Sequence, residues 1–325
     1  MGDLLIDALA QAIAPATAAF ALAAIGLNFH FGLTGLLNMG QAGFMLLGMY
    51  GFAISIREGL PLWAAVIVSF LCATIFGLLL GWPTLRLRGD YLAIVTIAAA
   101  EIIRYAGRSQ ALIELTNASK GILGKDYKFA FEVLSPFPNE RVTIWVFTMH
   151  GTASSSWWLT VVGWSLVLLL ALLFWRLSKS PWGRILKGIR EDEDAVRALG
   201  KNVYAYKMQA LVLGGVIGAL GGIIWALGSS VQPDSMGRTT TFWIWTILLL
   251  GGAATVFGPA LGSAIFWAAL VFVRGAAKLF IPSDVLPATA IEPFSLILVG
   301  VTLMLLVIFR PQGILGNKKE LAFHA

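Results

Sequence analysis

Polar side chains inside otherwise apolar segments are the residues of this sequence that could do chemistry. The segment Leu33–Ile56 carries no charge but contains two amides, Asn38 and Gln41, among glycines that include Gly40 and Gly43. A glycine inside a helix costs about 1 kcal/mol relative to alanine, and an amide in hydrocarbon needs hydrogen-bond partners. The pattern indicates a broken helix that lines a solute path, or a helix packed tightly against its neighbours, and the two are compatible.

A carboxylate stands in a second apolar segment, Tyr91–Ala106. Glu101 is followed by Arg104 and Arg108 at i+3 and i+7, so the three side chains share one helix face. An intramembrane carboxylate is a candidate for a functional site, while the neighbouring arginine offers a simple partner. Two interpretations stay open, a structural ion pair of Glu101 with Arg104 and a role of Glu101 in lining a path.

The motifs of the common enzyme classes do not occur in this sequence. It contains no G-x-x-x-x-G-K-[ST] phosphate loop, no G-x-S-x-G nucleophile elbow and no zinc-binding His-x-x-Glu-His motif. The histidines His30, His150 and His324 are far apart, and Cys72 is the single cysteine. We therefore expect no catalytic residue, no metal site and no cofactor.

The elements that must position the polar residues are predicted to be membrane-spanning helices. The 325 residues are 58% hydrophobic and 12% charged, with a mean hydropathy of +0.83, whereas soluble domains are about 25% charged. This composition excludes a disordered chain and a disulfide scaffold. It also argues against nucleic acid as the partner of the positive charge. We predict an all-α fold, a polytopic transmembrane helical bundle, because backbone groups in lipid need internal partners.

Apolar runs near the length that crosses a bilayer, about 20 residues, indicate about nine spans, with a range of eight to ten. They are Leu9–Phe29, Leu33–Ile56, Leu62–Leu85, Tyr91–Ala106, Trp157–Leu177, Met208–Ser229, Phe242–Phe257, Pro259–Val273 and Pro293–Phe309. The pair separated at Gly258 is the least distinct. The segment Lys128–Thr148 is a candidate for a tenth element, either re-entrant or interfacial.

The distribution of basic residues predicts the orientation of these spans. Residues 176–207 hold eight, residues 310–319 hold three, and Arg86 with Arg88 adds two, which makes 13 of the 23 Lys and Arg residues. The positive-inside rule assigns all three stretches to the cytoplasm. Nine spans then place the N-terminus and the region 107–156 outside and the tail 310–325 in the cytoplasm.

A charged segment between two expected spans, residues 178–206, has a distinctive pattern. Pro181 predicts the start of a helix, the acidic residues Glu191–Asp194 favour the start of a second short helix, and Gly200 ends it. The second helix has an apolar side made of Ala195, Val196 and Leu199. Either this side docks a partner protein, or the segment is a solvated run of charges.

Glycines at intervals of four residues recur along the chain. They are Gly77 and Gly81, then Gly214, Gly218 and Gly222, then Gly258 and Gly262. Small residues at this spacing let the backbones of membrane helices approach closely. We therefore expect close helix–helix crossings at these positions.

Several motifs of this chain, taken together in their order and spacing, resemble those of the LivM-type permease family. That family belongs to bacterial branched-chain amino acid importers driven by an ATP-binding cassette. The resemblance covers nearly the whole chain. It rests on the segments Thr34–Phe44 (TGLLNMGQAGF), Arg88–Thr96 with Glu101, Gly183–Gly200, Leu250–Gly262 and Arg310–Gly313.

The resemblance implies that residues 1–325 are one multi-pass permease domain in the bacterial cytoplasmic (inner) membrane, and not an enzyme. It would move branched-chain or similar amino acids inward, with ATP hydrolysed by separate subunits. The implied partners are a second, LivH-like permease, two LivG/LivF-like ATPase subunits, an extracytoplasmic substrate-binding protein and membrane lipid, but no nucleic acid.

The resemblance also implies roles for particular residues. The segment 178–206 would be the cytoplasmic coupling loop, and the region 107–156 would face the binding protein. The implied ATPase-coupling residues are Gly183, Arg184, Arg190, Glu191, Asp192, Glu193, Leu199 and Gly200. Those expected along the translocation path are Asn38, Gly40, Gln41, Gly43 and Glu101.

Three alternatives stay open. Related permeases carry urea or short amides, and neutral amides such as Asn38 and Gln41 do not identify the solute. A stand-alone channel or secondary carrier would need no ATPase. A membrane scaffold would have no obvious use for the polar, glycine-rich second segment.

Overall fold

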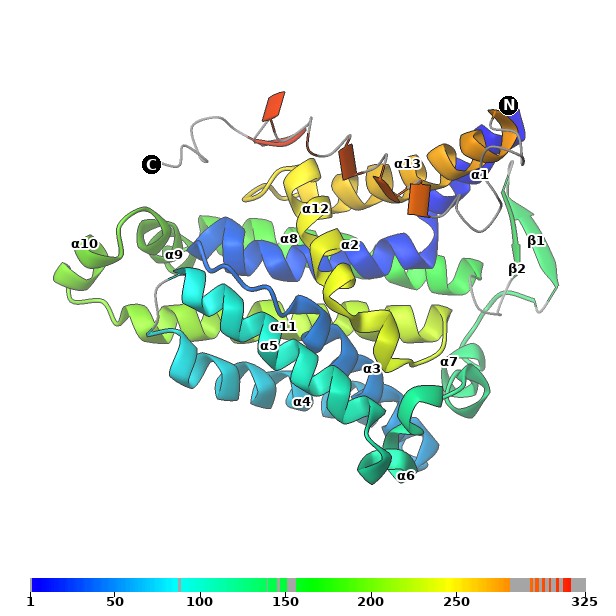
Figure 1. The fold of residues 1–325 in the computed structure, drawn as a ribbon, viewed down its shortest axis with the longest axis horizontal. Coiled ribbons are helices and arrows are strands. Elements are labelled where there is room, and N and C mark those ends of the chain that lie inside the picture. Colours follow the sequence, from blue (N-terminus) through cyan, green and yellow to red (C-terminus); the bar gives the residue numbers. More distant parts are fainter. Residues whose placement is uncertain are drawn as a thin grey trace.

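The computed structural model describes residues 2–86, 89–138, 140–144, 147–150, 156–280 and 312–316, with scattered positions between 293 and 309. Long helices run side by side along the longest axis of the molecule (Figure 1). The predicted all-helical class is confirmed. The described residues add one antiparallel hairpin of β1 (Arg141–Ile144) and β2 (Phe147–His150).

The first expected span, Leu9–Phe29, is two helices. α1 (Gly2–Ile13) ends just before Pro15, which occupies the first turn of α2 (Pro15–Asn28), the position where proline is best tolerated. Every residue of α2 except Ala16 is buried, as expected of a helix that is apolar all round. α2 packs against α3, α8, α11, α12 and α13 and forms the centre of the bundle.

Five helices are long and apolar enough to cross a membrane among the residues that the structure describes. They are Pro15–Leu33, Leu62–Thr84 (α4), Trp157–Lys179 (α8), Val203–Gly228 (α11) and Gly258–Leu279, the last within α13 (Gly258–Phe280).

The other expected spans differ from these five in length, charge or description. α3 (Gln41–Arg57) has 17 residues and α12 (Arg238–Gly251) has 14. α5 (Gly89–Arg108) carries several charged residues. The last expected span, Pro293–Phe309, lies largely outside the described residues.

The boundary between α12 and α13 differs from the expected one. We expected a span over Phe242–Phe257, but α12 ends at Gly251 and α13 begins at Gly258. Gly252 has φ +110°, a left-handed conformation that ends a helix and that glycine adopts readily. The freed carbonyls of the last turn are used by residues 312–316, because the N–H groups of Ile314 and Leu315 donate to Leu250 and Gly251.

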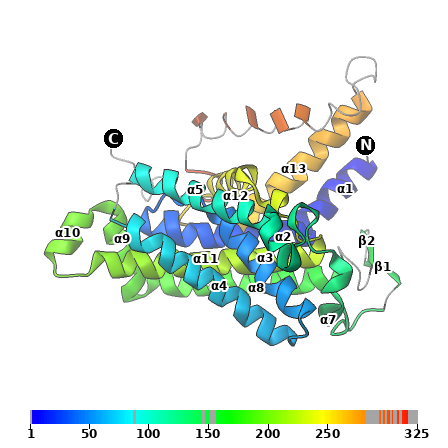
Figure 2. The ribbon, with the colours of Figure 1, turned by 60° about the horizontal axis from the view of Figure 1, so that its bottom comes forward.

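Two groups of short elements lie at opposite ends of the bundle in both views (Figures 1 and 2). One end holds α9 (Pro181–Glu191) and α10 (Glu193–Ala198). The other holds α7 (Phe129–Glu132), the β-hairpin and α6 (Ile113–Thr116), with the 3₁₀ turns Gln110–Leu112, Ala118–Lys120 and Gly124–Asp126. The structure therefore separates the regions 107–156 and 178–206, and the segment Lys128–Thr148 forms α7 and part of the hairpin.

Candidate functional site

The chain between α2 and α3 is not a continuous α-helix. A π-helical turn, η1 (Phe29–Leu33), follows α2, and residues 35–40 then form an irregular segment, the break, before α3 starts at Gln41. π turns are rare and often lie at functional sites. Gly35 has φ +72°, which favours glycine at this position. The second expected span thus begins with a break and continues as a helix.

His30, Asn38 and Gln41 form a fully buried amide–imidazole cluster at the break. The Asn38 amide nitrogen lies 3.0 Å from His30 Nδ1 and 3.1 Å from Gln41 Oε1, and Asn38 Oδ1 accepts from the Gly40 N–H at 2.8 Å. His30 Nε2 lies 2.9 Å from the Leu211 carbonyl. Because a carbonyl only accepts, Nε2 carries the hydrogen and Nδ1 accepts from Asn38.

Gln41 completes the cluster by bonding to two other helices. Its amide nitrogen donates to the carbonyls of Ala23 on α2 (3.2 Å) and Gly214 on α11 (3.3 Å). Both N–H groups and the oxygen of each amide therefore have a partner, which is what burial of an amide requires. The cluster fastens the start of α3 to α2 and α11.

Three further side chains, from α5 and α12, hold the backbone of the break and of the first turn of α3. Thr96 accepts from the Met39 N–H at 2.9 Å, and Thr241 accepts from the Ala42 N–H at 3.2 Å. Trp245 donates from Nε1 to the Asn38 carbonyl at 3.0 Å. These bonds replace the helical bonds that the break lacks, because backbone groups in an apolar interior need internal partners.

Gly40 and Gly43 permit a close approach of α5. A Cβ at Gly40 would overlap the Thr96 carbonyl oxygen, and one at Gly43 would lie 3.0 Å from the backbone of Ala100. The four expected path residues of the second segment are thus gathered where α3 meets α2, α5 and α11. All four of these residues are buried.

Asn28 links the end of α2 to the turn that follows α12. Its amide nitrogen donates to the Thr255 carbonyl and its oxygen accepts from the Ala254 N–H, each at 2.8 Å. Ala254 has φ +63°, an uncommon conformation for a residue with a side chain, and the Asn28 bonds hold it.

Glu101 lies apart from the break, in an ion cluster with residues of η5 (Pro233–Met236) and α12. Arg104 contacts Glu101 at 2.7 Å and Asp234 at 2.6 Å, and Arg108 contacts Asp234 at 3.2 Å. Arg238 Nε lies 3.9 Å from Glu101. Glu101 therefore pairs with Arg104, and the cluster fastens α5 to η5 and the start of α12.

The segment 178–206 forms two short helices with matched caps. Ser180 accepts from the Gly183 N–H ahead of α9, and Asp192 accepts from the N–H groups of Asp194 and Ala195 ahead of α10. The second helix therefore starts after an Asp192 cap, and Gly200, with φ +75°, follows its end.

The predicted apolar side of α10 is only partly exposed. Leu199 is 78% exposed, but Val196 is buried against α9, where its Cγ2 would lie 3.1 Å from a Cβ at Gly188. Arg184, Glu191 and Asp192 are also exposed. The free face of the loop thus combines one large apolar side chain with charges of both signs.

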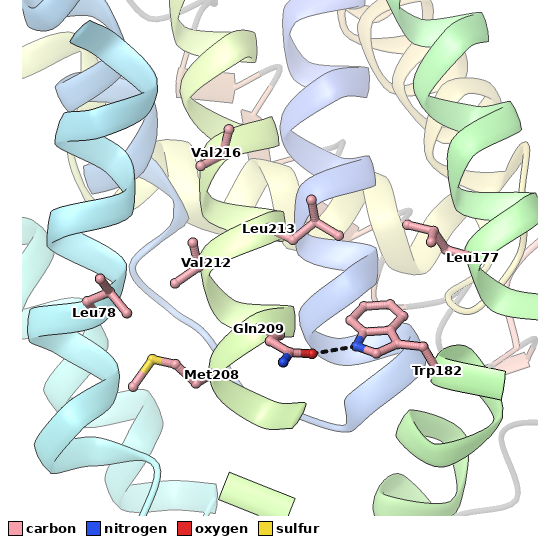
Figure 3. Close-up of a pocket in the computed structure, with 8 residues that line it drawn as sticks. All are labelled: Leu78, Leu177, Trp182, Met208, Gln209, Val212, Leu213 and Val216. Carbon is pink, nitrogen blue, oxygen red and sulfur yellow. Dashed lines mark hydrogen bonds between the residues drawn. The ribbon is translucent and has the colours of Figure 1, made fainter. Parts of the chain in front are cut away.

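Side-chain bonds attach the α9–α10 loop to the long helices. Trp182 Nε1 donates to Gln209 Oε1 at 2.8 Å, across an apolar groove of about 550 Å³ between α4, α8 and α11 (Figure 3). Lys207 of α11 forms an ion pair with Glu193. Arg190 Nη1 donates to the carbonyl of Gly32 in η1 at 2.5 Å.

The spaced glycines lie at close crossings. A Cβ at Gly214 would overlap the Gly26 carbonyl and His30, a Cβ at Gly218 would overlap Gln41, and a Cβ at Gly222 would overlap the Met45 carbonyl. Gly262 and Gly258 meet the backbone of α12 and the turn after it in the same way.

Sequence reasoning missed the partners of the predicted residues. His30, Thr96 and Trp245 bond to the break, Thr241 bonds to the start of α3, and Asn28 bonds to the turn after α12. Asn28 and His30 carried the same signal as Asn38, a polar side chain at the end of an apolar run. No group of three or more His, Cys, Asp or Glu that could hold a metal ion occurs among the described residues.

Comparisons with known proteins identify the family of this chain. The family model described as "Branched-chain amino acid transport system / permease component" matches residues 9–307. The high-affinity branched-chain amino acid transport system permease protein LivM of Escherichia coli (strain K12) is 30% identical over 310 residues, 93% of this chain and 69% of that protein. The probable LivM of Methanocaldococcus jannaschii is 24% identical and aligns over 91% of this chain and 90% of its own length.

Among solved structures, PsaBC from Streptococcus pneumoniae in complex with Fab has 18% sequence identity and a TM-score of 0.48, covering 95% of this chain and 96% of that one. The family match and the long apolar helices make this chain a multi-pass membrane protein. Because the family model spans almost all of the sequence and a curated relative at 30% identity covers 93% of it, the chain belongs to the family of branched-chain amino acid transport permease components.

Proposed function

We propose that this chain is the permease subunit of an ATP-driven importer that moves branched-chain or similar amino acids inward across the bacterial cytoplasmic membrane. The observation that carries the proposal is the family match over residues 9–307, together with the names of the relatives. The chain itself is not an enzyme, and separate ATPase subunits hydrolyse ATP.

The proposed topology has nine spans with the N-terminus outside and the C-terminus in the cytoplasm. The spans are α2, α3 with the break, α4, α5, α8, α11, α12, α13 and the segment Pro293–Phe309. The placement of 107–156 and 178–206 at opposite ends of the bundle supports this alternation (Figures 1 and 2). The tail 310–325 joins the cytoplasmic side.

The proposed translocation path runs beside the break. Asn38 and Gln41 are fully buried and hydrogen-bonded, so their part is to hold the backbone of the path wall, with Gly40 and Gly43 allowing the close approach of α5. Glu101 is 18% exposed in its ion pair with Arg104. We place it along the same path, nearer to the end of the bundle that holds the region 107–156. The second permease supplies the facing wall.

The proposed partners follow from the two ends of the bundle. A LivH-like permease pairs with this chain in the membrane, two LivG/LivF-like ATPases dock on the coupling loop 178–206, and an extracytoplasmic binding protein docks on the region 107–156. The proposed contact with the ATPases includes Leu199, which is 78% exposed and would gain free energy on burial.

Reconstitution tests the proposal. The chain is placed in liposomes, either alone or with its partner permease, ATPases and binding protein. Uptake of labelled leucine is then measured with and without ATP. We expect uptake only when ATP and binding protein are both present, and competition by excess leucine but not by excess urea. Uptake by the chain alone would refute the importer in favour of a channel, and competition by urea would replace the amino acid with an amide.

Substitution tests the coupling loop. Replacing Arg184, Glu191 and Glu193 together with alanine should abolish uptake while the chain remains in the membrane. Undiminished uptake by this triple variant would refute the role of the loop.

A further inference from the structure

Helix α9 of the coupling loop is bonded to different parts of the bundle at its two ends. At its N-terminal end Trp182 donates to Gln209 on α11 (Figure 3). At its C-terminal end Arg190 donates to the Gly32 carbonyl at 2.5 Å, 158 residues away in sequence. The second bond leads directly to the break that precedes α3.

Arg190 contacts the chain on both sides of the point where the break begins. Its guanidinium reaches back to Gly32, inside η1, while its stem lies against Gly35, where a Cβ would be 3.1 Å from Arg190 Cγ. The side chain is only 12% exposed, although its neighbour Glu191 is 73% exposed. Arg190 is thus a mostly buried charge at the end of α9, beside Ile189, which is also buried.

Gly32 is closely surrounded by residues of α2 and of the turn that follows α12. A Cβ at this position would overlap the Asn28 side-chain oxygen and lie 2.7 Å from the Ala254 nitrogen. Asn28 in turn bonds to the turn after α12. Close-packed interiors transmit strain rather than dissipate it, so a pull on the Gly32 carbonyl moves η1 and the break together.

Space for such a movement exists beside the bond. A polar cavity of about 290 Å³ lies between the loop and the break, lined by residues of both, including Gly35, Leu36, Ile189 and Glu193. The cavity wall includes Lys207, which forms an ion pair with Glu193. The end of α9 and the break therefore face each other across a gap that Arg190 bridges.

We propose that Arg190 is a positioning residue that transmits movement of the coupling loop to the break, and through it to the amide–imidazole cluster. This inference rests on the proposed importer function. The bond joins a charged N–H donor to a carbonyl, and such charge-assisted bonds are stronger than neutral ones, so it transmits displacement in either sense. His30 lies two residues before Gly32, and Asn38 six residues after it, so the cluster is within the reach of a shift at Gly32.

The test uses the complete importer in liposomes, with wild type, Arg190→Ala, Arg190→Lys and Gln209→Leu compared. The measured quantity is leucine taken up per ATP hydrolysed, normalised to the amount of assembled complex. We expect Arg190→Ala to lower this ratio about tenfold, equivalent to about 1.4 kcal/mol. Arg190→Lys should recover most of the ratio, because an ammonium group still donates to the Gly32 carbonyl.

Gln209→Leu is the matched control, because it removes the hydrogen bond at the other end of the same helix without touching the break. It should leave the ratio at the wild-type value. A wild-type ratio in Arg190→Ala, or an equal fall in Gln209→Leu, would overturn the proposal. So would a loss of assembled complex that accounts for the whole fall in uptake, since that is the effect of a purely structural residue.

Failure of this inference is distinct from failure of the proposed function. If the wild-type complex shows no ATP-dependent uptake, the importer function is refuted before any variant is compared. If the wild-type complex takes up leucine and Arg190→Ala does so with the same ratio, only the role of Arg190 is refuted.

Discussion

Asn38→Leu tests whether the amide–imidazole cluster holds the break. Leucine has a branching pattern similar to that of asparagine but can neither donate nor accept a hydrogen bond. The substitution removes the two N–H groups that reach His30 and Gln41 and the oxygen that accepts from Gly40. All three lost partners are buried, so no water replaces the lost bonds.

The expected loss in the free energy of unfolding follows from the number of hydrogen bonds removed. Side-chain hydrogen bonds between membrane helices average about 0.6 kcal/mol and reach about 1.7 kcal/mol, because the unfolded chain in the membrane also finds partners. Three bonds therefore correspond to a fall of about 2 to 5 kcal/mol in the free energy of unfolding. A single surface substitution changes this free energy by less than about 0.5 kcal/mol.

The assay is unfolding of the purified chain in mixed detergent and SDS, followed by tryptophan fluorescence, for Asn38→Leu, His30→Leu and the double variant. The double-mutant cycle should give a coupling free energy of about 0.6 to 1.7 kcal/mol for the hydrogen bond between Asn38 and His30. Asn202→Leu serves as the control, since Asn202 caps α11 at an exposed position and should combine additively with His30→Leu. Additivity of Asn38→Leu and His30→Leu within about 0.3 kcal/mol would refute the cluster.

Other predictions concern the helix crossings, the loop and the end opposite to it. Gly214→Ala should abolish the folded, monodisperse protein in size-exclusion chromatography, because its Cβ overlaps the Gly26 carbonyl, whereas Gly300→Ala, with no atom within 4 Å, should elute as wild type. Leu199→Glu should weaken co-purification of the ATPases about tenfold or more without changing the unfolding temperature, since burial of a leucine contributes about 1.5 to 3 kcal/mol. Burial raises the pKa of the Tyr127 phenol above its ordinary value of 10.0, so the folded chain keeps a proton that the unfolded chain loses. The resulting stability is present below about pH 10 and is lost as the pH rises. Tyr127→Phe should therefore show a smaller fall in unfolding temperature between about pH 9 and pH 12, and an identical fall would contradict the burial of this phenol.

The sequence by itself was sufficient for the helical class, the two short helices of the segment 178–206 and the polar residues worth testing. These features depend on local physics. Apolar runs predict helices in lipid, Pro181 and Gly200 mark the bounds of the loop helices, and an amide such as Asn38 stands out in an uncharged segment. The same local rule could have found Asn28 and His30, which are polar residues at the end of the first run.

The tertiary structure decided where segments are interrupted and which partners the polar residues choose. Local pattern placed one span over Leu33–Ile56, but residues 35–40 leave the helix because side chains of α5 and α12 supply the bonds that a helix would have made. Likewise α12 ends at Gly251 because residues 312–316 occupy its last carbonyls.

The long-range bonds explain the limit of sequence reasoning. Gln41 bonds to Gly214, 173 residues away, and Asn28 bonds to Thr255, 227 residues away. A sequence shows that a buried amide needs partners, since an unpaired one is costly in an apolar interior. It does not show which backbone carbonyl lies opposite, because that depends on how the helices cross, and the crossings depend on the glycines of several helices at once.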